Sequence, residues 1–287
     1  MASPMQVVEH PDPFLAGTRR APRSRRAALR NGRWWLRLAS LLCFILIWQL
    51  LAQHKLSLGF ITFANVPAPT EVAPAFWQLL HSPKLPTHLI ASISRVLVGF
   101  CAASAVGVGF GLAIGRYRAF EDSLLPSLEV LRPIPAVAWI PLAILMFPSA
   151  EMSMMFITFI GALFPILLST IHGVEGVDPR LVATARSLGT GRVALFWEVI
   201  VPGAAPSIFT GLSIGMGTAW FCLVTAEMIA GQYGIGYFTW ESYTLQNYAD
   251  IVVGMVFIGA LGMGSSVLVK RIGLALTPWY RLGEARQ

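Results

Sequence analysis

Residues 152–171 read MSMMFITFIGALFPILLSTI, twenty residues without a charged side chain. At a rise of about 1.5 Å per residue, a helix of this length crosses a bilayer hydrocarbon core of about 30 Å. The stretch therefore predicts a transmembrane helix. The composition of the whole chain agrees, because 55% of its 287 residues are hydrophobic and only 12% are charged, whereas soluble domains carry about a quarter charged residues.

Five further stretches are long and apolar enough to cross a membrane. They are residues 34–52, 88–115, 124–147, 204–229 and 249–269. The third of these contains four prolines, which interrupt helical hydrogen bonding, and only a tight turn separates it from residues 152–171. We therefore expect an all-α integral membrane fold with six transmembrane helices, the third of them broken, and a short surface helix over residues 70–81.

The basic residues indicate the orientation of these helices. With the amino terminus placed inside, the inner segments hold 17 of the 21 Lys and Arg residues and the outer segments hold two. Cytoplasmic loops carry such an excess, so both termini are expected to face the cytoplasm. The divisions that follow are a basic cytoplasmic arm (1–37), a first transmembrane helix with a periplasmic segment (38–87), a core of five transmembrane helices (88–273) with a cytoplasmic loop (172–198), and a cytoplasmic tail (274–287).

Several other classes of protein fit the sequence poorly. The basic arm adjoins an apolar stretch and lacks the features of a folded nucleic-acid-binding face, so we expect no nucleic-acid partner. The three cysteines and five histidines have no ligand spacing, so no metal site is expected. No Gly-Lys dipeptide occurs, which excludes a phosphate-binding P-loop. The pattern GLSIG at residues 211–215 matches a hydrolase nucleophile motif around Ser213, but it lies inside an apolar stretch, where closely spaced glycines favour helix packing.

The loop after residues 152–171 contains a well-marked helix. Residues 176–202 read GVDPRLVATARSLGTGRVALFWEVIVP. Asp178 is a good N-cap, Pro179 suits the first helical position, and Gly189 can end the helix in a left-handed turn. Four apolar residues are expected to share one face, namely Leu181, Val182, Ala185 and Leu188. Such a helix rests on lipid as an interfacial element, serves as a plain connector, or docks onto a partner.

The same loop resembles the signature of ATP-binding-cassette importer permeases, which is Glu-Ala-Ala, three residues, Gly, nine residues and Ile-x-Leu-Pro. Here Ala183, Thr184 and Ala185 are followed at that spacing by Gly189 and by a segment that ends at Pro202; Ala183 replaces the acidic residue. The stretches SISRVLVGF (92–100), LRPIPAVAWIPLAI (131–144) and AEMIAGQYGIGYF (226–238) resemble the nitrate, sulfonate, taurine and bicarbonate branch of these permeases.

The resemblance implies a type I importer permease in a bacterial inner membrane, and no enzyme. It would pair with a second copy, two ATPase subunits that bind ATP and Mg, and a periplasmic or lipid-anchored binding protein. The ATPase would contact the loop helix through Arg180, Ala183, Thr184, Ala185, Arg186, Leu188, Gly189 and Pro202.

Charged residues within membrane spans are costly and often functional. We hypothesise that Arg132, Trp139, Thr218 and Trp220 border a passage for a small anion, such as nitrate, a sulfonate, taurine or bicarbonate. Arg132 pairing with Glu129 or reaching the interface is the competing interpretation. Glu227 is expected either to contribute to an outer gate or to the surface that receives a binding protein, or to form a salt bridge with a neighbouring helix. Arg95 is expected to be an interface anchor.

Two alternatives remain open at this point. A secondary transporter driven by an ion gradient would also tolerate a broken helix, and it predicts inverted repeats and buried carboxylates. An intramembrane hydrolase built on Ser213 lacks suitably placed partners in the sequence.

Overall fold

The computed structural model describes residues 23–57, 59 and 62–280, with side chains placed from Trp34 onward. Most of the expected basic arm (residues 1–22) and the end of the expected tail (residues 281–287) lie outside the described residues. Within the described part, five helices are long and apolar enough to cross a membrane, and a bent pair of shorter helices makes a sixth candidate when the pair is taken as one span. The expectation of an all-α fold with six candidate spans is confirmed.

Three long helices form the core, and α6 (Ala150–Glu175) lies between the other two, α3 (Lys84–Arg116) and α9 (Val201–Ala230). Small residues allow the close approach, as the glycine spacing indicated. A Cβ added at Gly111 of α3 would lie 2.6 Å from the Cβ of Thr170, and one added at Gly215 of α9 would lie 2.7 Å from Cγ1 of Ile166. The helices are therefore packed too tightly at these positions for a larger residue.

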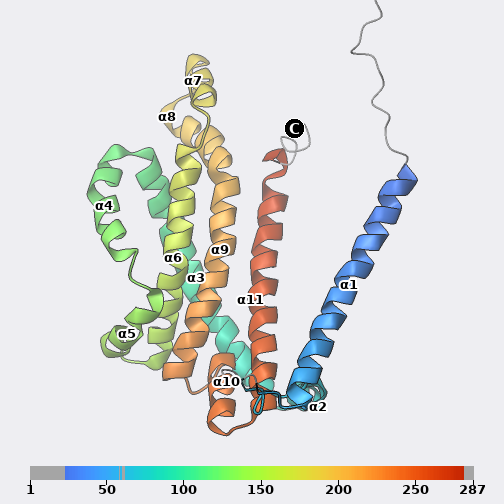
Figure 1. Ribbon diagram of the computed structural model, residues 1–287. Helices are drawn as coiled ribbons and strands as arrows, with labels where there is room; N and C mark the ends of the chain where they lie inside the picture. Colours follow the sequence, from blue (N-terminus) through green and yellow to red (C-terminus); the bar gives the residue numbers. More distant parts are fainter. Residues whose placement is uncertain (1–22, 58, 60–61, 281–287) are drawn as a thin grey trace, which may run out of the picture.

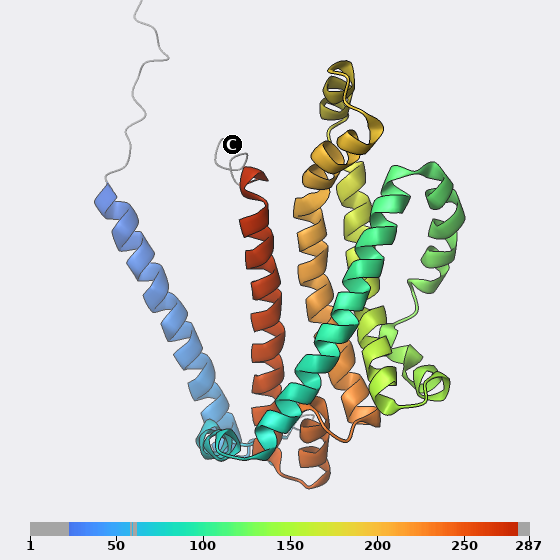
Figure 2. The same ribbon diagram turned by 180° about the vertical axis from the view of Figure 1, so that it is seen from behind.

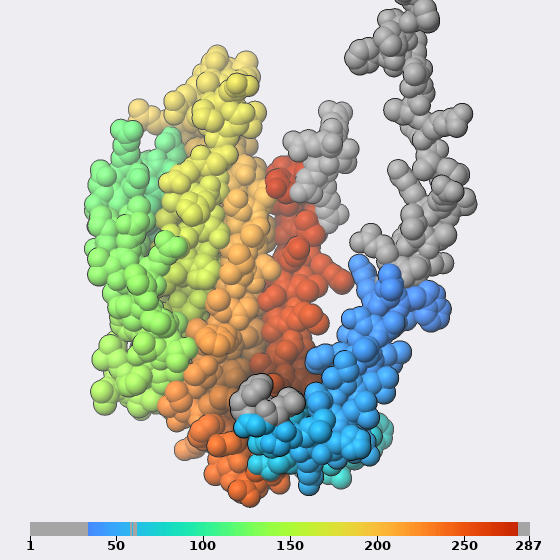
Figure 3. Space-filling view, viewed as in Figure 1, coloured from blue at the N-terminus to red at the C-terminus, as the bar shows by residue number. Residues whose placement is uncertain are grey.

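Two further long helices lie at the periphery, α1 (Arg23–Gln53) and α11 (Tyr248–Leu276). Figures 1 and 3 show α11 alongside α9, whereas α1 diverges from α11 over most of its length. The expected surface helix is present as α2 (Pro69–Leu80), and it holds the end of α1 because Gln49 Nε2 donates to Oγ1 of Thr70 at 3.1 Å. Elsewhere α1 presents large apolar side chains outward, as a helix in contact with lipid would.

The third span is broken more sharply than the sequence indicated. It consists of α4 (Arg118–Leu131), a 3-10 turn η2 (Ala136–Trp139) and α5 (Ile140–Met146), and the two halves meet at 84°. The break itself agrees with the expectation, but the first helix begins at Arg118, six residues before the expected start of the span at residue 124, so that only Tyr117 separates it from α3. Pro133 and Pro135 have no N–H to continue α4, and the chain turns between them.

The fifth span is longer than expected. The short α8 (Arg192–Ala194) and a π-helical segment η3 (Leu195–Ile200) lead directly into α9, which gives a continuous helix over Arg192–Ala230 of 39 residues. The expected loop over 172–198 therefore ends in helix. Pro202 lies in the first turn of α9 and cannot donate the α-helical hydrogen bond, and the wider π segment precedes it.

The helices give the molecule two distinct ends (Figures 1 and 2). The loop helix α7 (Pro179–Ser187), the start of α1 and the end of α11 lie together at one end, called the α7 end below. At the opposite end, called the α10 end, lie α2 and a helix that the sequence did not predict, α10 (Ile235–Thr244). The start of α1 and the end of α11 lie at the same end of the molecule. This agrees with an even number of membrane crossings between them.

Candidate functional site

The helix α7 is capped at both termini as its sequence predicts. Oδ1 of Asp178 accepts a hydrogen bond from the backbone N–H of Arg180 at 2.8 Å, and Pro179 occupies the first turn. At the other terminus Gly189 has a φ of +83°, Thr190 N–H donates to the carbonyl of Ala185 and Gly189 N–H donates to that of Arg186. These two bonds make a Schellman motif, so α7 is a short helix with a fixed beginning and end.

The apolar residues of α7 do not all share one buried face, which corrects the sequence expectation. Val182 and Ala185 pack against the cluster around Leu195 at the base of α9, whereas Leu181 and Leu188 are 58% and 81% exposed. A nine-residue helix has room for only one contact face, and α9 takes the Val182 side. Leu188 and Leu181 therefore project away from the molecule.

The other loop residues of interest are exposed and surround these two leucines. Arg180, Ala183, Thr184, Arg186 and Gly189 are all exposed. Two more exposed apolar side chains lie on the adjoining helix, Val193 and Trp197, and the sequence reasoning missed them because this segment was expected to be loop. The α7 end thus presents apolar side chains flanked by arginines, which suits contact with another protein.

The residues expected along a passage are only partly brought together. Trp139 of η2 and Trp220 of α9 belong to one apolar cluster. Trp220 is 4% exposed and its Nε1 donates to Oγ of Ser265 on α11 at 2.8 Å, which is a packing position. Thr218 is half-buried and donates to the carbonyl of Gly215. None of these contacts tests the passage itself, which stays a prediction.

Arg132 lies at the C-terminal end of α4, beside the break in the third span. Its side chain is exposed, and within the described residues it forms no ion pair with Glu129 or with any other carboxylate. A cation at a bend in a membrane protein, with no counter-charge from the described chain, is available to an anion or to water.

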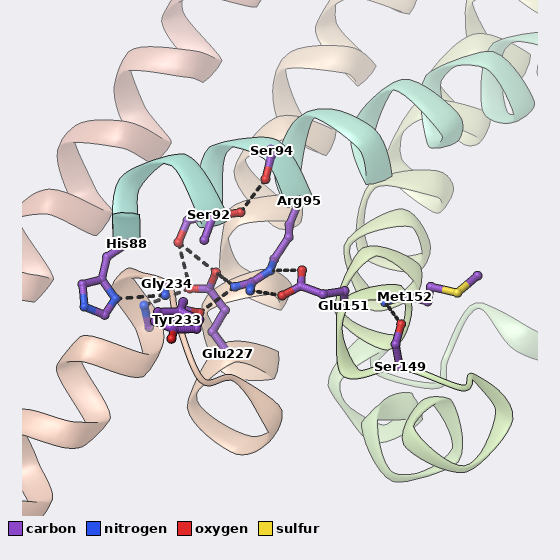
Figure 4. Close-up of polar contacts among 12 residues, drawn as sticks. His88, Ser92, Ser94, Arg95, Ser149, Glu151, Met152, Glu227, Tyr233 and Gly234 are labelled. Carbon is purple, nitrogen blue, oxygen red and sulfur yellow. Dashed lines mark hydrogen bonds and ion pairs between the residues drawn. The ribbon is translucent and has the colours of Figure 1, made fainter. Parts of the chain in front are cut away.

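A buried cluster at the α10 end joins the three core helices (Figure 4). Arg95 of α3 is 1% exposed. Its Nη1 donates to Oε1 of Glu227 on α9 at 2.8 Å, and its Nε donates to Oε2 of Glu151 on α6 at 2.7 Å, with a second, very short contact from Nη2 to Oε1 of Glu151. Nη1 also donates to the carbonyl of Tyr233 at 2.7 Å. The expectation of an interface anchor at Arg95 is therefore wrong.

The carboxylate of Glu227 has the densest set of partners in this cluster. It is fully buried and accepts from Oγ of Ser92 at 2.8 Å and from the backbone N–H of Gly236 at 2.9 Å, in addition to Arg95. Of the two interpretations left open for Glu227, the salt bridge is the one observed. A buried ion pair with every acceptor bonded fixes its surroundings, because losing one partner leaves a buried charge unpaired.

The cluster extends into the turn before α10. Gly234 donates its N–H to Nδ1 of His88 at 3.1 Å, and Ile235 donates to Oγ of Ser92 at 2.9 Å. Gly234 has a φ of +125°, and a Cβ there would collide with the Glu227 carboxylate. We call these residues the Arg95 cluster, which consists of His88, Ser92, Arg95, Glu151 and Glu227. The cluster fixes the adjoining ends of α3, α6 and α9 relative to one another and also positions α10. Isolated charges in apolar stretches were its only signal in the sequence.

Comparisons with known proteins give a consistent result. Residues 105–282 match the model of a family described as "Binding-protein-dependent transport system inner membrane component". The protein of Escherichia coli that is named as an aliphatic sulfonates transport permease, SsuC, is 36% identical over 90% of this chain and 96% of its own length. The nitrate import permease NrtB of Synechocystis is 34% identical over 76% of this chain and 80% of its own length. The bicarbonate transport system permease CmpB of Synechococcus elongatus is 32% identical over 79% and 84%.

Proposed function

Because the chain belongs to the family of binding-protein-dependent transport system inner membrane components, we propose that it is the permease subunit of an ATP-driven importer and forms a passage for a small oxyanion. It would lie in a bacterial inner membrane with the α7 end facing the cytoplasm. The excess of basic residues in the segments at that end supports this orientation.

The observation that carries the proposal is the construction of α7. The helix is capped at both termini, presents Leu181 and Leu188 outward and packs through Val182 and Ala185 on the base of a continuous 39-residue helix. A force applied to α7 would therefore reach the core without passing through a flexible segment. Attachment to an ATPase subunit is the use that best fits such an element.

The partners follow from this role. Two ATPase subunits would bind ATP and Mg and would each receive one α7, from this chain and from a second copy. A periplasmic or lipid-anchored binding protein would deliver the solute at the α10 end. The chain itself would hold no cofactor and perform no hydrolysis.

The class of solute is proposed from the relatives together with Arg132. Nitrate, aliphatic sulfonates and bicarbonate, for which the relatives are named, share a negative charge spread over oxygens. The guanidinium of Arg132 is exposed beside the bend in the third span, and a guanidinium matches the geometry of such oxygens. Trp139, Thr218 and Trp220 are placed near the passage by the same proposal, although the buried Trp220 would act only as packing.

Leu188→Ser tests the attachment of the ATPase. Removing an exposed apolar anchor from an interface costs more than about 1 kcal/mol at anchor positions, and about 1.4 kcal/mol is tenfold in affinity. We expect the variant to lose most of the co-purifying ATPase and most of the solute-stimulated ATP hydrolysis. Ser187→Ala, which alters the neighbouring exposed residue without removing apolar surface, is the matched control and should behave as the natural chain.

Full retention of the ATPase by Leu188→Ser would contradict the proposed contact. The mode of energy supply is tested separately in proteoliposomes that contain the permease, its ATPase and a binding protein. Import should require ATP on the side of the vesicle membrane that carries the ATPase, which corresponds to the cytoplasm. It should persist when ion gradients are collapsed. Import that follows the ion gradient and ignores ATP would favour the secondary-transporter alternative.

A further inference from the structure

A cavity of about 680 Å³ lies beside the contact between α9 and α11 at the α7 end, where Gly273 of α11 packs against Phe209 of α9. Its lining comes from the last turns of α6, the first half of α9 and the last half of α11, and it includes Gly176, Ser207, Ile214, Lys270, Leu274 and Tyr280. Near the middle of α9, hydrogen bonds join the two helices, because Ser213 Oγ donates to the carbonyl of Ser266 and Trp220 Nε1 donates to Oγ of Ser265. The volume lies in the range of ligand sites in proteins, about 300–1,000 Å³.

The described lining carries one charge, and it is positive. Lys270 is exposed and forms no ion pair with a described residue, and the lining contains no Asp or Glu among those residues. The hydroxyl of Ser207, half-buried on the opposite wall, donates no hydrogen bond to any group that the structure describes. A cation opposite a free hydroxyl donor favours an anionic ligand that presents oxygen acceptors.

The position of the cavity relative to the membrane surface indicates where that anion comes from. Lys270 ends the apolar part of α11, and the exposed side chains that precede it on this helix are apolar, including Val267 and Leu268. Trp279, half exposed just beyond α11, is of the residue type that marks the headgroup level of a bilayer. Lys270 is thus positioned where a long lysine side chain reaches the lipid headgroups, with apolar surface directly below it.

We propose that this cavity binds the phosphate group of an anionic phospholipid, with Lys270 and Ser207 as its ligands and the acyl chains along Ile214, Leu274 and the adjoining face of α11. Basic pockets between helices at the cytoplasmic membrane surface bind anionic headgroups in this way. The bound lipid would fill the space between α9 and α11 and hold α11 against the core at the α7 end.

Native mass spectrometry of the purified complex tests the proposal without any transport measurement, so its failure is distinguishable from failure of the proposed function. The protein is exchanged into detergent with phosphatidylglycerol or with phosphatidylcholine, and the retained lipid is counted. We expect the natural chain to retain phosphatidylglycerol at least fivefold better than phosphatidylcholine. Lys270→Gln should lose this preference, and Arg271→Gln, a charge neighbour that does not line the cavity, should keep it.

Ser207→Ala gives an independent readout from the opposite wall, and we expect it to weaken retention of phosphatidylglycerol about two- to threefold. Equal retention by Lys270→Gln and the natural chain would overturn the proposal. So would equal retention of the two lipids. Displacement of phosphatidylglycerol by millimolar inorganic phosphate, with the same dependence on Lys270, would overturn the lipid source and identify a site for a free oxyanion.

Discussion

The two ends of the molecule are built in opposite ways. At the α10 end, Arg95 joins α3, α6 and α9 through hydrogen-bonded ion pairs with the buried Glu227 and the half-exposed Glu151, and the start of α10 is bonded to the Glu227 carboxylate. At the α7 end, a cavity lies beside the contact between α9 and α11, and the loop helix stands on the surface with Leu181 and Leu188 exposed. Burial with complete pairing holds one end in a single arrangement, whereas the other end offers surfaces for partners. Substitutions at the α10 end should therefore lower the stability of the protein. Substitutions at the α7 end should instead weaken its contacts with partners.

The largest effect on stability is expected from Arg95→Met. It leaves the buried Glu227 carboxylate without its cation, and removing one partner of a buried ion pair costs about 3–5 kcal/mol. The midpoint of thermal unfolding in detergent should fall steeply, and the double variant Arg95→Met with Glu227→Gln should recover part of the loss. A single variant as stable as the natural chain would show that the α10 end is not fixed by these pairs.

A smaller loss is expected from Gly234→Ala in the same region. The residue has a φ of +125°, and an added Cβ would meet the Glu227 carboxylate. Backbone conformations of this kind cost a residue with a side chain about 1–3 kcal/mol. The matched control is Gly259→Ala on α11, where nothing lies within 4 Å of the added Cβ, and the unfolding midpoint of this control should not fall.

At the α7 end, Asp178→Ala should have a local effect only. The loss of an N-cap costs about 1 kcal/mol, and α7 lies outside the core. Hydrogen exchange at the backbone amides of Arg180, Leu181 and Val182 should accelerate while the global unfolding midpoint stays unchanged. Asp178→Asn keeps the capping oxygen and should exchange as the natural chain does; acceleration in both variants would mean that the cap does not order α7.

The smallest effect on stability and a large effect on transport are expected from Arg132→Gln. The side chain is exposed and unpaired among the described residues, and surface substitutions change stability by less than about 0.5 kcal/mol. Uptake should be abolished while assembly and basal ATP hydrolysis remain. Arg118→Gln, an exposed arginine at the other end of α4, is the control, and normal uptake by Arg132→Gln would exclude the guanidinium from the passage.

The contrast between the ends also explains what the sequence predicts well. The cap residues of α7, Asp178, Pro179 and Gly189, act within a few residues of one another, and each was assigned correctly. The membrane spans follow from local hydropathy in the same way. Local signals of this kind need no knowledge of the rest of the fold.

The features that the sequence did not predict depend on distant contacts. Arg95 lies 56 residues from Glu151 and 132 from Glu227, and no spacing rule joins them. The helix α10 follows a glycine-rich turn and is held by Ser92 and Glu227, which belong to other helices. The division of the apolar residues of the loop helix into a packed side, Val182 and Ala185, and an exposed side, Leu181 and Leu188, depends on where α9 lies. Tertiary packing decides each of these points.

The continuous helix over Arg192–Ala230 has a mechanical consequence, because it runs from the base of α7 to Glu227. At about 1.5 Å per residue, its 39 residues extend over roughly 58 Å, about twice the hydrocarbon thickness of a bilayer. If this helix tilted as a rigid rod about its Arg95 anchorage, a tilt of roughly 10° would move its far tip by about 10 Å. Under the proposed function, a displacement imposed at the α7 end would therefore decline along the helix, and the pivot would hardly move.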